Sequence, residues 1–439
     1  MNEATAFFRT PRREQGQILI MVAVLMISLM GFVGLVVDTG HLYAERRQTQ
    51  NAADEAATAG ARERLYGGSV SAATTAALST ASGNGFNNNG TSNTVTVHIP
   101  PTSGPHVGDS TFVEVTVWQQ PKTLFIQALG VGGSVKSRGV AGFVPVPKNY
   151  ALLVLNASMC SAYNQTSNST LTINGGGAMI DSSCRPSASQ GGGSLVTSEV
   201  LDYYSAGSWQ LSNNASTSVP PSAVGSQIAD PLASLTPPVP CAQNGTPAGC
   251  IAKLTDSIGT ANNPRLTHIT NNTPVTIHPG TYYGGLKFSG SGAVTLQPGT
   301  YVMAGGGFDY SGTSSITGNG VTIFNTYDSY HNSGDGVCGA IALQGNGVLN
   351  LSGPPSGAYK NMLFWQDRAC TNQFKYAGSS YTTTGIIYLP TAPLNISGGG
   401  NLGSMQIIVD SFSYSGSAAV SINYGNYVAI SQPRVALIE

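Results

Sequence analysis

The chain has 439 residues, more than one compact hydrophobic core usually holds, so two or three units or one elongated repeat architecture are expected. It contains 55 glycines and 24 prolines but only 9% charged residues, a composition that is rich in turns and poor in exposed helix surface. The formal net charge of −1, without a basic stripe interleaved with aromatic residues, gives no electrostatic reason to bind nucleic acid.

Residues 18–37 form an uncharged apolar run after a short amino-terminal segment, 1–17. The run reads ILIMVAVLMISLMGFVGLVV and has Ser28 as its only polar side chain. A helix of this length, at about 1.5 Å per residue, spans about 30 Å, which is the thickness of the hydrocarbon core of a bilayer. We therefore expect one transmembrane helix. The alternative is a cleaved secretory signal, but the apolar part of such a signal is usually only about 7 to 15 residues long.

A juxtamembrane segment, 38–66, continues without proline and is expected to be further helix. Small side chains recur in it at helical spacing and form one narrow face, made by Thr49, Ala52, Ala53, Ala56 and Gly60. Because small side chains let a second helix approach closely, we expect this face to pack on a partner helix. The alternative is an exposed stalk, in which the alanines only reflect a high helix propensity.

Polar landmarks at fixed distances from the apolar run carry a resemblance to a known family. The segment from Gly16 to Glu63 resembles the amino-terminal segment of TadG-like proteins of the tight-adherence (Flp) pilus assembly system. In that family an apolar helix is followed by the pattern V-D-x-G-x-x-Y, an arginine, and then Q-x-A-A-D-A-A-A-L-A-G-A. The resemblance implies a pilin-like anchor helix, with its first half in lipid and its second half packed on protein. The matching residues are Asp38, Gly40, Tyr43, Arg46, Gln50, Ala53, Asp54, Ala56, Ala57, Gly60 and Ala61.

Residues 67–148 are expected to form a small α+β, pilin-like unit. After a loose Ser-, Thr-, Ala-, Gly- and Asn-rich connection (67–91), TVTVHI (94–99) and TFVEVTVW (111–118) alternate as half-buried strands. PKTLFIQAL begins with Pro121 and predicts a short helix, and GGSVKSRGVAGFVPV predicts a further strand. A similar strand, helix and strand region follows the anchor in TadG-like proteins.

The remainder, 149–439, shows a near-constant step of about 20 residues between short apolar runs. HPGTYYGGLKF begins at His278 and is echoed by QPGTYVMAGGGF, which begins at Gln297, nineteen residues later. Short strands separated by Gly, Asn and Ser turns at such a period are typical of a solenoid, so we predict a mainly β chain with a right-handed parallel β-helix. The alternative is an antiparallel sandwich, whose strands recur at about 8 to 12 residues. A Pro-rich excursion, 219–249, is expected to cross the solenoid face or to link its two parts.

Six cysteines all lie beyond the apolar run. The sequence has no CxxC pair and no histidine at zinc-finger spacing, so disulfides in an oxidising compartment are expected, with no metal and no cofactor. This favours a single-pass membrane protein with a cytoplasmic amino terminus and an exported carboxy-terminal domain; the arginines on the two sides of the helix add only a slight bias. The resemblance implies that the membrane is that of a bacterial cell. Other connectivities stay open, but the proposed pairs are Cys160 with Cys184, Cys241 with Cys250, and Cys338 with Cys370.

Parallel β-helices often act on polysaccharides, so catalysis has to be considered. Glycosidic cleavage needs two carboxylates about 5 to 10 Å apart, and a lyase needs a base with cationic neighbours. The candidate residues lie on different predicted coils or in turns, where an isolated aspartate usually caps backbone groups, so no catalytic residue is expected. These candidates are Asp309, Asp328, Asp335, Asp367 and Arg368.

We therefore predict a non-enzymatic, membrane-anchored envelope protein that acts in pilus assembly or surface adhesion, as the resemblance implies. Its expected partners are the membrane and other pilus or envelope assembly proteins, with a surface glycan as a further candidate. Two alternatives stay open. One is a membrane-anchored, polysaccharide-active β-helix enzyme, and the other is an adhesin that is independent of pili.

Overall fold

The chain forms two compact units. Unit 1 comprises Met1–Val144 and Arg434–Glu439, and unit 2 comprises Pro145–Pro433, so that unit 2 is inserted in the sequence of unit 1. The predicted range of the β-helix, 149–439, ends too late, because the last strand of the chain belongs to the sheet of unit 1. The computed structural model describes residues 15–123, 125–128, 133–241, 267–270, 272–328, 338–378, 381–416 and 419–438.

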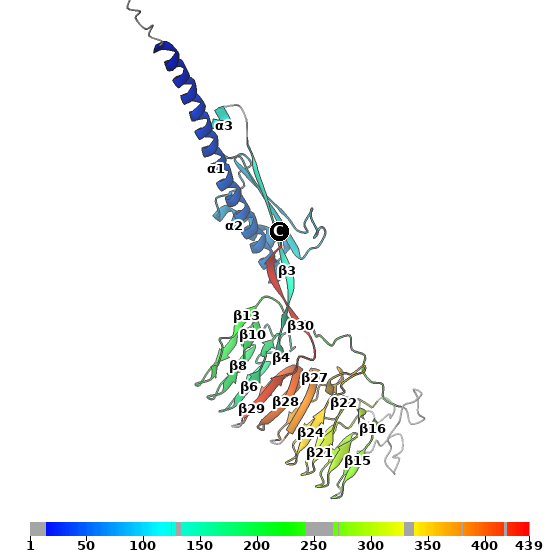
Figure 1. Cartoon of the computed structure of the whole chain (residues 1–439). Coiled ribbons are helices and arrows are strands. Elements are labelled where there is room, and N and C mark those ends of the chain that lie inside the picture. Colours follow the sequence, from blue (N-terminus) through cyan, green and yellow to red (C-terminus); the bar gives the residue numbers. More distant parts are fainter. Residues whose placement is uncertain are drawn as a thin grey trace, which may run out of the picture. The chain divides into compact units, whose positions relative to one another are not determined.

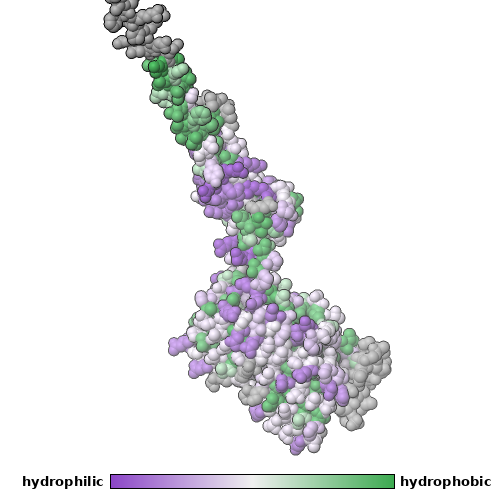
Figure 2. Space-filling view, in the orientation of Figure 1, coloured by the Kyte–Doolittle hydropathy of each residue, from purple (hydrophilic) through white to green (hydrophobic). Residues whose placement is uncertain are grey.

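Unit 1 contains one long helix, α1, which runs without interruption from Gln15 to Leu65 (Figure 1). The large apolar side chains between Ile18 and Val37 are 49–75% exposed, and Figure 2 shows them as a continuous hydrophobic surface. Among the described residues, one helix, Ile18–Leu65, is long and apolar enough to cross a membrane. Only about 20 residues fit in a hydrocarbon core of about 30 Å, so the second half of α1 is available to pack on protein.

A second helix, α2 (Val70–Gly83), lies where the composition predicted a loose connection. Ser69 caps it, because its Oγ accepts a hydrogen bond from the backbone N–H of Ala72 at 3.1 Å. Alanine buries little apolar area, so the buried face gives only a weak hydrophobic pattern in the sequence, which explains the wrong prediction. That face is made by Ala73, Ala77 and Ala81.

The sheet of unit 1 has four strands in the order β1-β2-β3-β30. The first three strands pair antiparallel, and a short helix, α3 (Phe125–Ala128), lies in the connection between β2 and β3. This is the predicted order of strands and short helix. The bounds of the strands are Asn93–His98 for β1, Phe112–Gln119 for β2, Val135–Lys148 for β3 and Ile430–Leu437 for β30.

Unit 2 is a stack of coils that form a large parallel sheet, which confirms the mainly β, solenoid-like fold predicted from the step of about 20 residues. Each strand pairs in parallel with the strand at the same position of the next coil. The coils nearest the start of unit 2 contain β4 (Tyr150–Val154), β5 (Tyr163–Gln165), β6 (Thr170–Asn174), β7 (Gly177–Ile180), β8 (Ala188–Gln190), β9 (Leu195–Thr197), β10 (Val200–Tyr204), β11 (Trp209–Leu211), β12 (Ser216–Thr217) and β13 (Ser222–Val224). The later coils contain β14 (Thr267–Ile269), β15 (Val275–Ile277), β16 (Gly280–Tyr283), β17 (Leu286–Phe288), β18 (Val294–Leu296), β19 (Gly299–Ala304), β20 (Phe308–Tyr310), β21 (Ile316–Gly318), β22 (Val321–Thr326), β23 (Ile341–Leu343), β24 (Leu349–Ser352), β25 (Met362–Gln366), β26 (Phe374–Tyr376), β27 (Tyr381–Ile396), β28 (Gly400–Tyr414) and β29 (Ala419–Tyr424).

The coils are not stacked in sequence order. The last coil of the chain pairs with the first, because β28 lies beside β4 and β5, and β29 lies beside β6. In the register of these strands, Ile407 is opposite Leu152. The chain therefore enters and leaves the stack at its middle, while β13 and β15 lie towards opposite ends (Figure 1).

A segment that we call the strap, residues 226–241, returns the chain along one face of this stack. Its side chains Ile228, Leu232 and Leu235 pack in a cluster with Trp365 and Tyr388 on the outer side of the sheet. The described part of the predicted Pro-rich excursion thus crosses the solenoid face. Residues 242–249 of that excursion lie outside the described residues.

Hydrogen bonds hold the strap at three successive places. The N–H of Ile228 donates to Asp181 Oδ1 (3.0 Å), and the N–H of Cys241 donates to Thr281 Oγ1 (2.9 Å). Between them, Asp230 accepts from the hydroxyl of Tyr388 (2.7 Å) and pairs with Arg368. Asp181 follows β7, whereas Thr281 belongs to β16, so the strap ties the early coils to the late ones.

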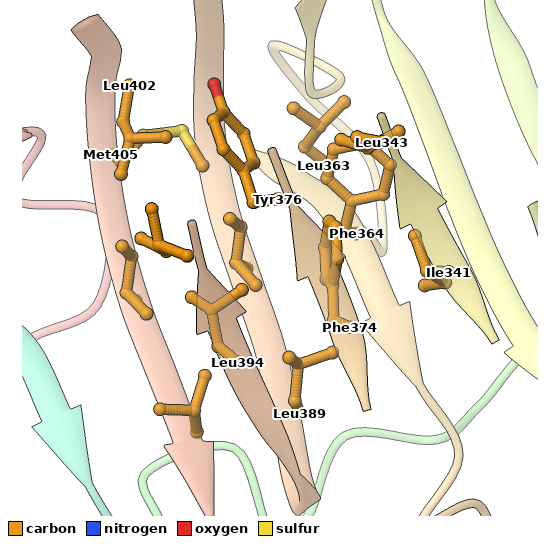
Figure 3. Close-up of a cluster of buried hydrophobic side chains, with 14 of the residues drawn as sticks. Ile341, Leu343, Leu363, Phe364, Phe374, Tyr376, Leu389, Leu394, Leu402 and Met405 are labelled. Atoms are coloured by element: carbon orange, nitrogen blue, oxygen red, sulfur yellow. The ribbon is translucent and has the colours of Figure 1, made fainter. Parts of the chain in front are cut away.

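The interior of the stack is filled by the alternate side chains of very short strands. In a strand of three residues the first and third side chains point to one face, so a single outward residue separates two core residues. Leu286, Phe308 and Ile341 are paired in register on successive coils and are fully buried. Figure 3 shows part of this interior, in which the ring centroids of Phe364 and Phe374 are 5.1 Å apart.

Two disulfides lie within the described part of unit 2. Cys160 pairs with Cys184, and Cys338 pairs with Cys370, with Cα–Cα distances of 4.9 and 5.5 Å. Both pairs were predicted from neighbouring positions in the sequence and are confirmed. The third predicted pair, Cys241 with Cys250, includes a residue outside the described part of the chain.

Candidate functional site

The second half of α1 is docked on the sheet of unit 1, and this docking site contains most of the residues singled out by the sequence. The alanines of its small-residue face are 0% exposed. They pack against the helix α2 of the same chain and against β2 and β3, so a helix does pack on this face, but it belongs to the chain itself and the sheet shares the face with it. The cluster contains Ala52, Ala53, Ala56, Ala57 and Ala61 of α1, Ala77 and Ala81 of α2, and Val113, Val115, Val117 and Ala141 of the sheet.

Two glycines allow the backbones to touch at this site. A methyl group on Gly139 of β3 would lie 2.7 Å from the carbonyl carbon and oxygen of Ala53. A methyl group on Gly60 of α1 would lie 3.0 Å from Val113 Cγ1 and 3.2 Å from the carbonyl oxygen of Ala73. Any side chain at Gly139 would therefore push the helix away from the strand.

Polar side chains on the rim of the same face bond to β3. Thr49 Oγ1 and Ser137 Oγ are 2.7 Å apart, and both residues are buried. Gln50 Nε2 donates to the backbone carbonyl of Arg138 and to Asp54 Oδ1, each at 2.8 Å. Burial raises the pKa of Asp54, and the hydrogen bond from Gln50 opposes this shift. The family-motif residues Gln50 and Asp54 thus fix the register between helix and strand.

Asp38 contacts the β2–β3 connection at the point where the apolar run of α1 ends. Its side chain is 1% exposed, and Oδ2 accepts hydrogen bonds from the backbone N–H groups of Phe125 (2.8 Å) and Ile126 (2.7 Å). These are the first two residues of α3, whose amino-terminal donors would otherwise need other partners. Asp38 therefore ties the β2–β3 connection to α1.

The predicted site residues divide into two groups. The contacts above bring together Asp38, Gln50, Ala53, Asp54, Ala56 and Gly60. Gly40 and Tyr43 lie apart from them: no atom comes within 4 Å of a methyl group placed on Gly40, and Tyr43 is 66% exposed. Ser137 and Gly139 were not predicted as site residues, although a glycine inside a strand often marks a close backbone approach.

On the opposite face of the sheet, Glu114 forms a second polar cluster, whose residues were not predicted as a site. Its side chain is 3% exposed and accepts four hydrogen bonds, from the N–H and hydroxyl of Thr102, the hydroxyl of Ser103 and Nε of Arg138, at 2.6 to 3.0 Å. Burial alone would raise the pKa of Glu114, but these hydrogen bonds, led by that from Arg138, lower it to about 2. The cluster borders an open polar cavity of about 600 Å³ that is also lined by Trp118.

Unit 1 should lose stability in acid because of Glu114. The folded pKa of about 2 lies below the ordinary value of 4.5, so the carboxylate contributes stability above pH 4.5, and this contribution is lost as the pH falls from 4.5 towards 2. Glu114→Gln should therefore destabilise unit 1 by about 2 to 3 kcal/mol at pH 7 and by much less near pH 2.5. Thermal unfolding of the detergent-solubilised chain at both pH values measures this difference. Exposed Glu199→Gln is the control, and an equal loss at both pH values would contradict the prediction.

Three of the candidate catalytic residues of unit 2, Asp309, Asp367 and Arg368, make structural contacts. Asp309 Oδ2 pairs with Lys287 Nζ at 3.2 Å, and Asp367 accepts from the hydroxyl of Thr326 and from the N–H of Ala369, each at 2.9 Å. Arg368 binds the strap through Asp230. Asp335 lies outside the described residues. No group of three or more His, Cys, Asp or Glu side chains that could hold a metal ion occurs in the part of the chain that is described.

Comparison with known proteins finds a family similarity for the α1 side of the docking site. Residues 16–63 match the family model Tad, described as "Putative Flp pilus-assembly TadE/G-like", and this range coincides with α1. No curated protein and no solved structure matches the chain. The match and the candidate membrane helix together support a membrane-anchored, pilus-assembly-related protein. The predicted resemblance is confirmed for this segment: residues 16–63 are similar to the TadE/G-like Flp pilus-assembly family.

Proposed function

We propose that this chain is a non-enzymatic component of Flp pilus assembly that is anchored in the membrane by α1. The observation that carries the proposal is the TadE/G-like segment, because the residues of that segment build the docking site between the anchor helix and the sheet. The proposal puts the residues before α1 in the cytoplasm and both units in an exported, oxidising compartment. The disulfides Cys160–Cys184 and Cys338–Cys370 support that orientation, because disulfides persist in oxidising compartments.

A non-catalytic role is supported by the ion pair and hydrogen bonds that two of the candidate carboxylates make. Glycosidic cleavage needs a protonated and an ionised carboxyl group that face one substrate. Asp309, the middle residue of β20, is instead paired with Lys287, the middle residue of β17. Asp367 caps a turn after β25. Their contacts account for both side chains without a reaction.

Surface attachment by unit 2 is a second candidate function, favoured by a ladder of uncharged polar side chains. Thr276, Thr295, Thr317, Asn350 and Thr382 are opposite one another on β15, β18, β21, β24 and β27, and all five are exposed. Paired strands repeat at about 4.8 Å, so hydroxyl and amide groups are presented at this regular spacing. We propose that this ladder binds a neutral glycan, whose hydroxyl groups would form hydrogen bonds with it.

Deletion and complementation in the source bacterium test both candidates. Deletion of the gene should abolish surface Flp pili, measured as pilin in the sheared fraction, and the wild-type gene should restore them. Thr295→Lys with Thr317→Lys should restore pili but not attachment to a glycan-coated surface, because two long cations would disrupt the neutral ladder. Ala342→Lys, on another face of the same coils, is the control and should restore both.

The outcomes separate the two candidates. Pili that persist after deletion, with attachment lost, would contradict the assembly role and leave attachment alone. Attachment that is unchanged by the two lysines would contradict the ladder and leave the assembly role intact.

A further inference from the structure

The β2–β3 connection contacts α1 within the apolar run, at Gly34, as well as at Asp38, directly after the run. Gly34 is buried, whereas Val33 and Leu35 on either side are 56% and 51% exposed. The ring of Phe125 covers Gly34: a methyl group on this glycine would lie 2.4 Å from Phe125 Cγ. Phe125 itself remains 46% exposed, so one edge of the ring rests on the helix and the other faces outward.

The depth of Phe125 follows from the helix geometry. Gly34 precedes Asp38 by one turn of α1, a rise of about 6 Å, and lies within the twenty-residue run that fits a hydrocarbon core. Asp38 holds the backbone of Phe125 and Ile126 by two hydrogen bonds, which fixes the connection at this level. The outward edge of the Phe125 ring is therefore level with the last lipid-facing turn of α1.

The chain around Phe125 has the character of a membrane interface. Residues 123–135 contain no charged side chain, and Lys122 and Lys136 flank them. Aromatic side chains are enriched at the level of lipid headgroups, with flanking lysines on the aqueous side. A protein ligand would have to contact Phe125 between the exposed apolar side chains of α1, which lipid covers once the helix is inserted.

From these positions we propose that Phe125 is a second membrane-binding point of unit 1, inserted in the same bilayer leaflet in which the apolar run of α1 ends. The proposal rests on the membrane anchoring by α1. Because Phe125 contacts α1 on one side only, through Gly34 and Asp38, its insertion would restrict the tilt of the helix in the bilayer. Unit 1 would then be attached to the membrane at two points.

Quenching by brominated phospholipid tests the proposal in full-length protein reconstituted in vesicles. Phe125→Trp keeps an aromatic ring at the site, and its emission is obtained by subtracting that of the wild type, whose own tryptophans are Trp118, Trp209 and Trp365. Lipid brominated near the headgroup end of its acyl chains should quench this added emission, because interfacial aromatic rings lie at the level of the headgroups.

Two matched tryptophans decide how the result is interpreted. Tyr66→Trp, just beyond the end of α1, should not be quenched, and Val24→Trp, in the middle of the apolar run, should be quenched by lipid brominated deep in the chains. Quenching at 24 with none at 125 would overturn the second attachment point alone. An unquenched tryptophan at 24 would overturn membrane anchoring and this proposal together. Circular dichroism checks that each variant is folded.

Discussion

Gly139→Ala is expected to separate α1 from the sheet of unit 1, although it adds only one methyl group. That methyl group would lie 2.7 Å from backbone atoms of Ala53 and from Asp54 Oδ1, closer than carbon atoms approach without a shift. Because the obstacle is mostly helix backbone, no side-chain rotation can relieve the contact. The expected cost is about 3 kcal/mol, at the upper end of the values for overpacked cores.

Hydrogen exchange of the detergent-solubilised protein measures this loss. Exchange should rise in peptides that cover 49–65 and 112–119, which form the two sides of the docking site, and should stay unchanged in unit 2. Gly40→Ala is the matched control, because its methyl group meets no atom within 4 Å and alanine is favoured over glycine in a helix by about 1 kcal/mol. Equal exchange in the two variants would contradict the close approach at Gly139.

The Gly139 contact also shows what the sequence of α1 could and could not predict. The apolar run, the motif residues and the small-residue face were read correctly from α1 alone, because helical spacing is a local property. The strand that covers part of this face is not local: Gly139 and Ser137 of β3 lie more than 80 residues after Ala53 and Thr49, which they contact. A small face admits a helix or a strand equally well, and here it packs against both the helix α2 and the strands β2 and β3; the spacing in α1 alone does not indicate the strands.

The sequence predicts that the coils of unit 2 stack, but it does not predict the order in which they stack. A step of about 20 residues reports that each coil resembles the next, and parallel stacking follows from that repetition. The same step arises whether coils stack in sequence order or start from the middle. The pairing of β28 with β4 joins residues about 250 positions apart. In the sequence, only the Pro-rich excursion, part of which forms the strap between the early and the late coils, indicates that the chain passes from one end of the stack to the other.

Leu152→Ala tests this order directly and should cost about 2 to 5 kcal/mol, because Leu152 is fully buried and a cavity would remain. Leu152 lies between two neighbours in the stack, Ala178 of the next coil and Ile407 of the last coil. In a stack where each coil contacts mainly its neighbours, the loss spreads to both sides. Hydrogen exchange should therefore rise in β7 and in β28, although β28 is far away in the sequence.

Leu201→Ala provides the matched comparison for this last prediction. Leu201 is 1% exposed, on β10, and is also opposite Ala178, but on the side away from the junction between the first and last coils. The same side-chain truncation should raise exchange in β7 and β10 and leave β28 and β29 protected, because two coils separate Leu201 from β28. If Leu152→Ala also left β28 and β29 at wild-type exchange, the first and last coils would not be stacked on one another. The middle of unit 2 would then be open, and the strap alone would have to join its two halves.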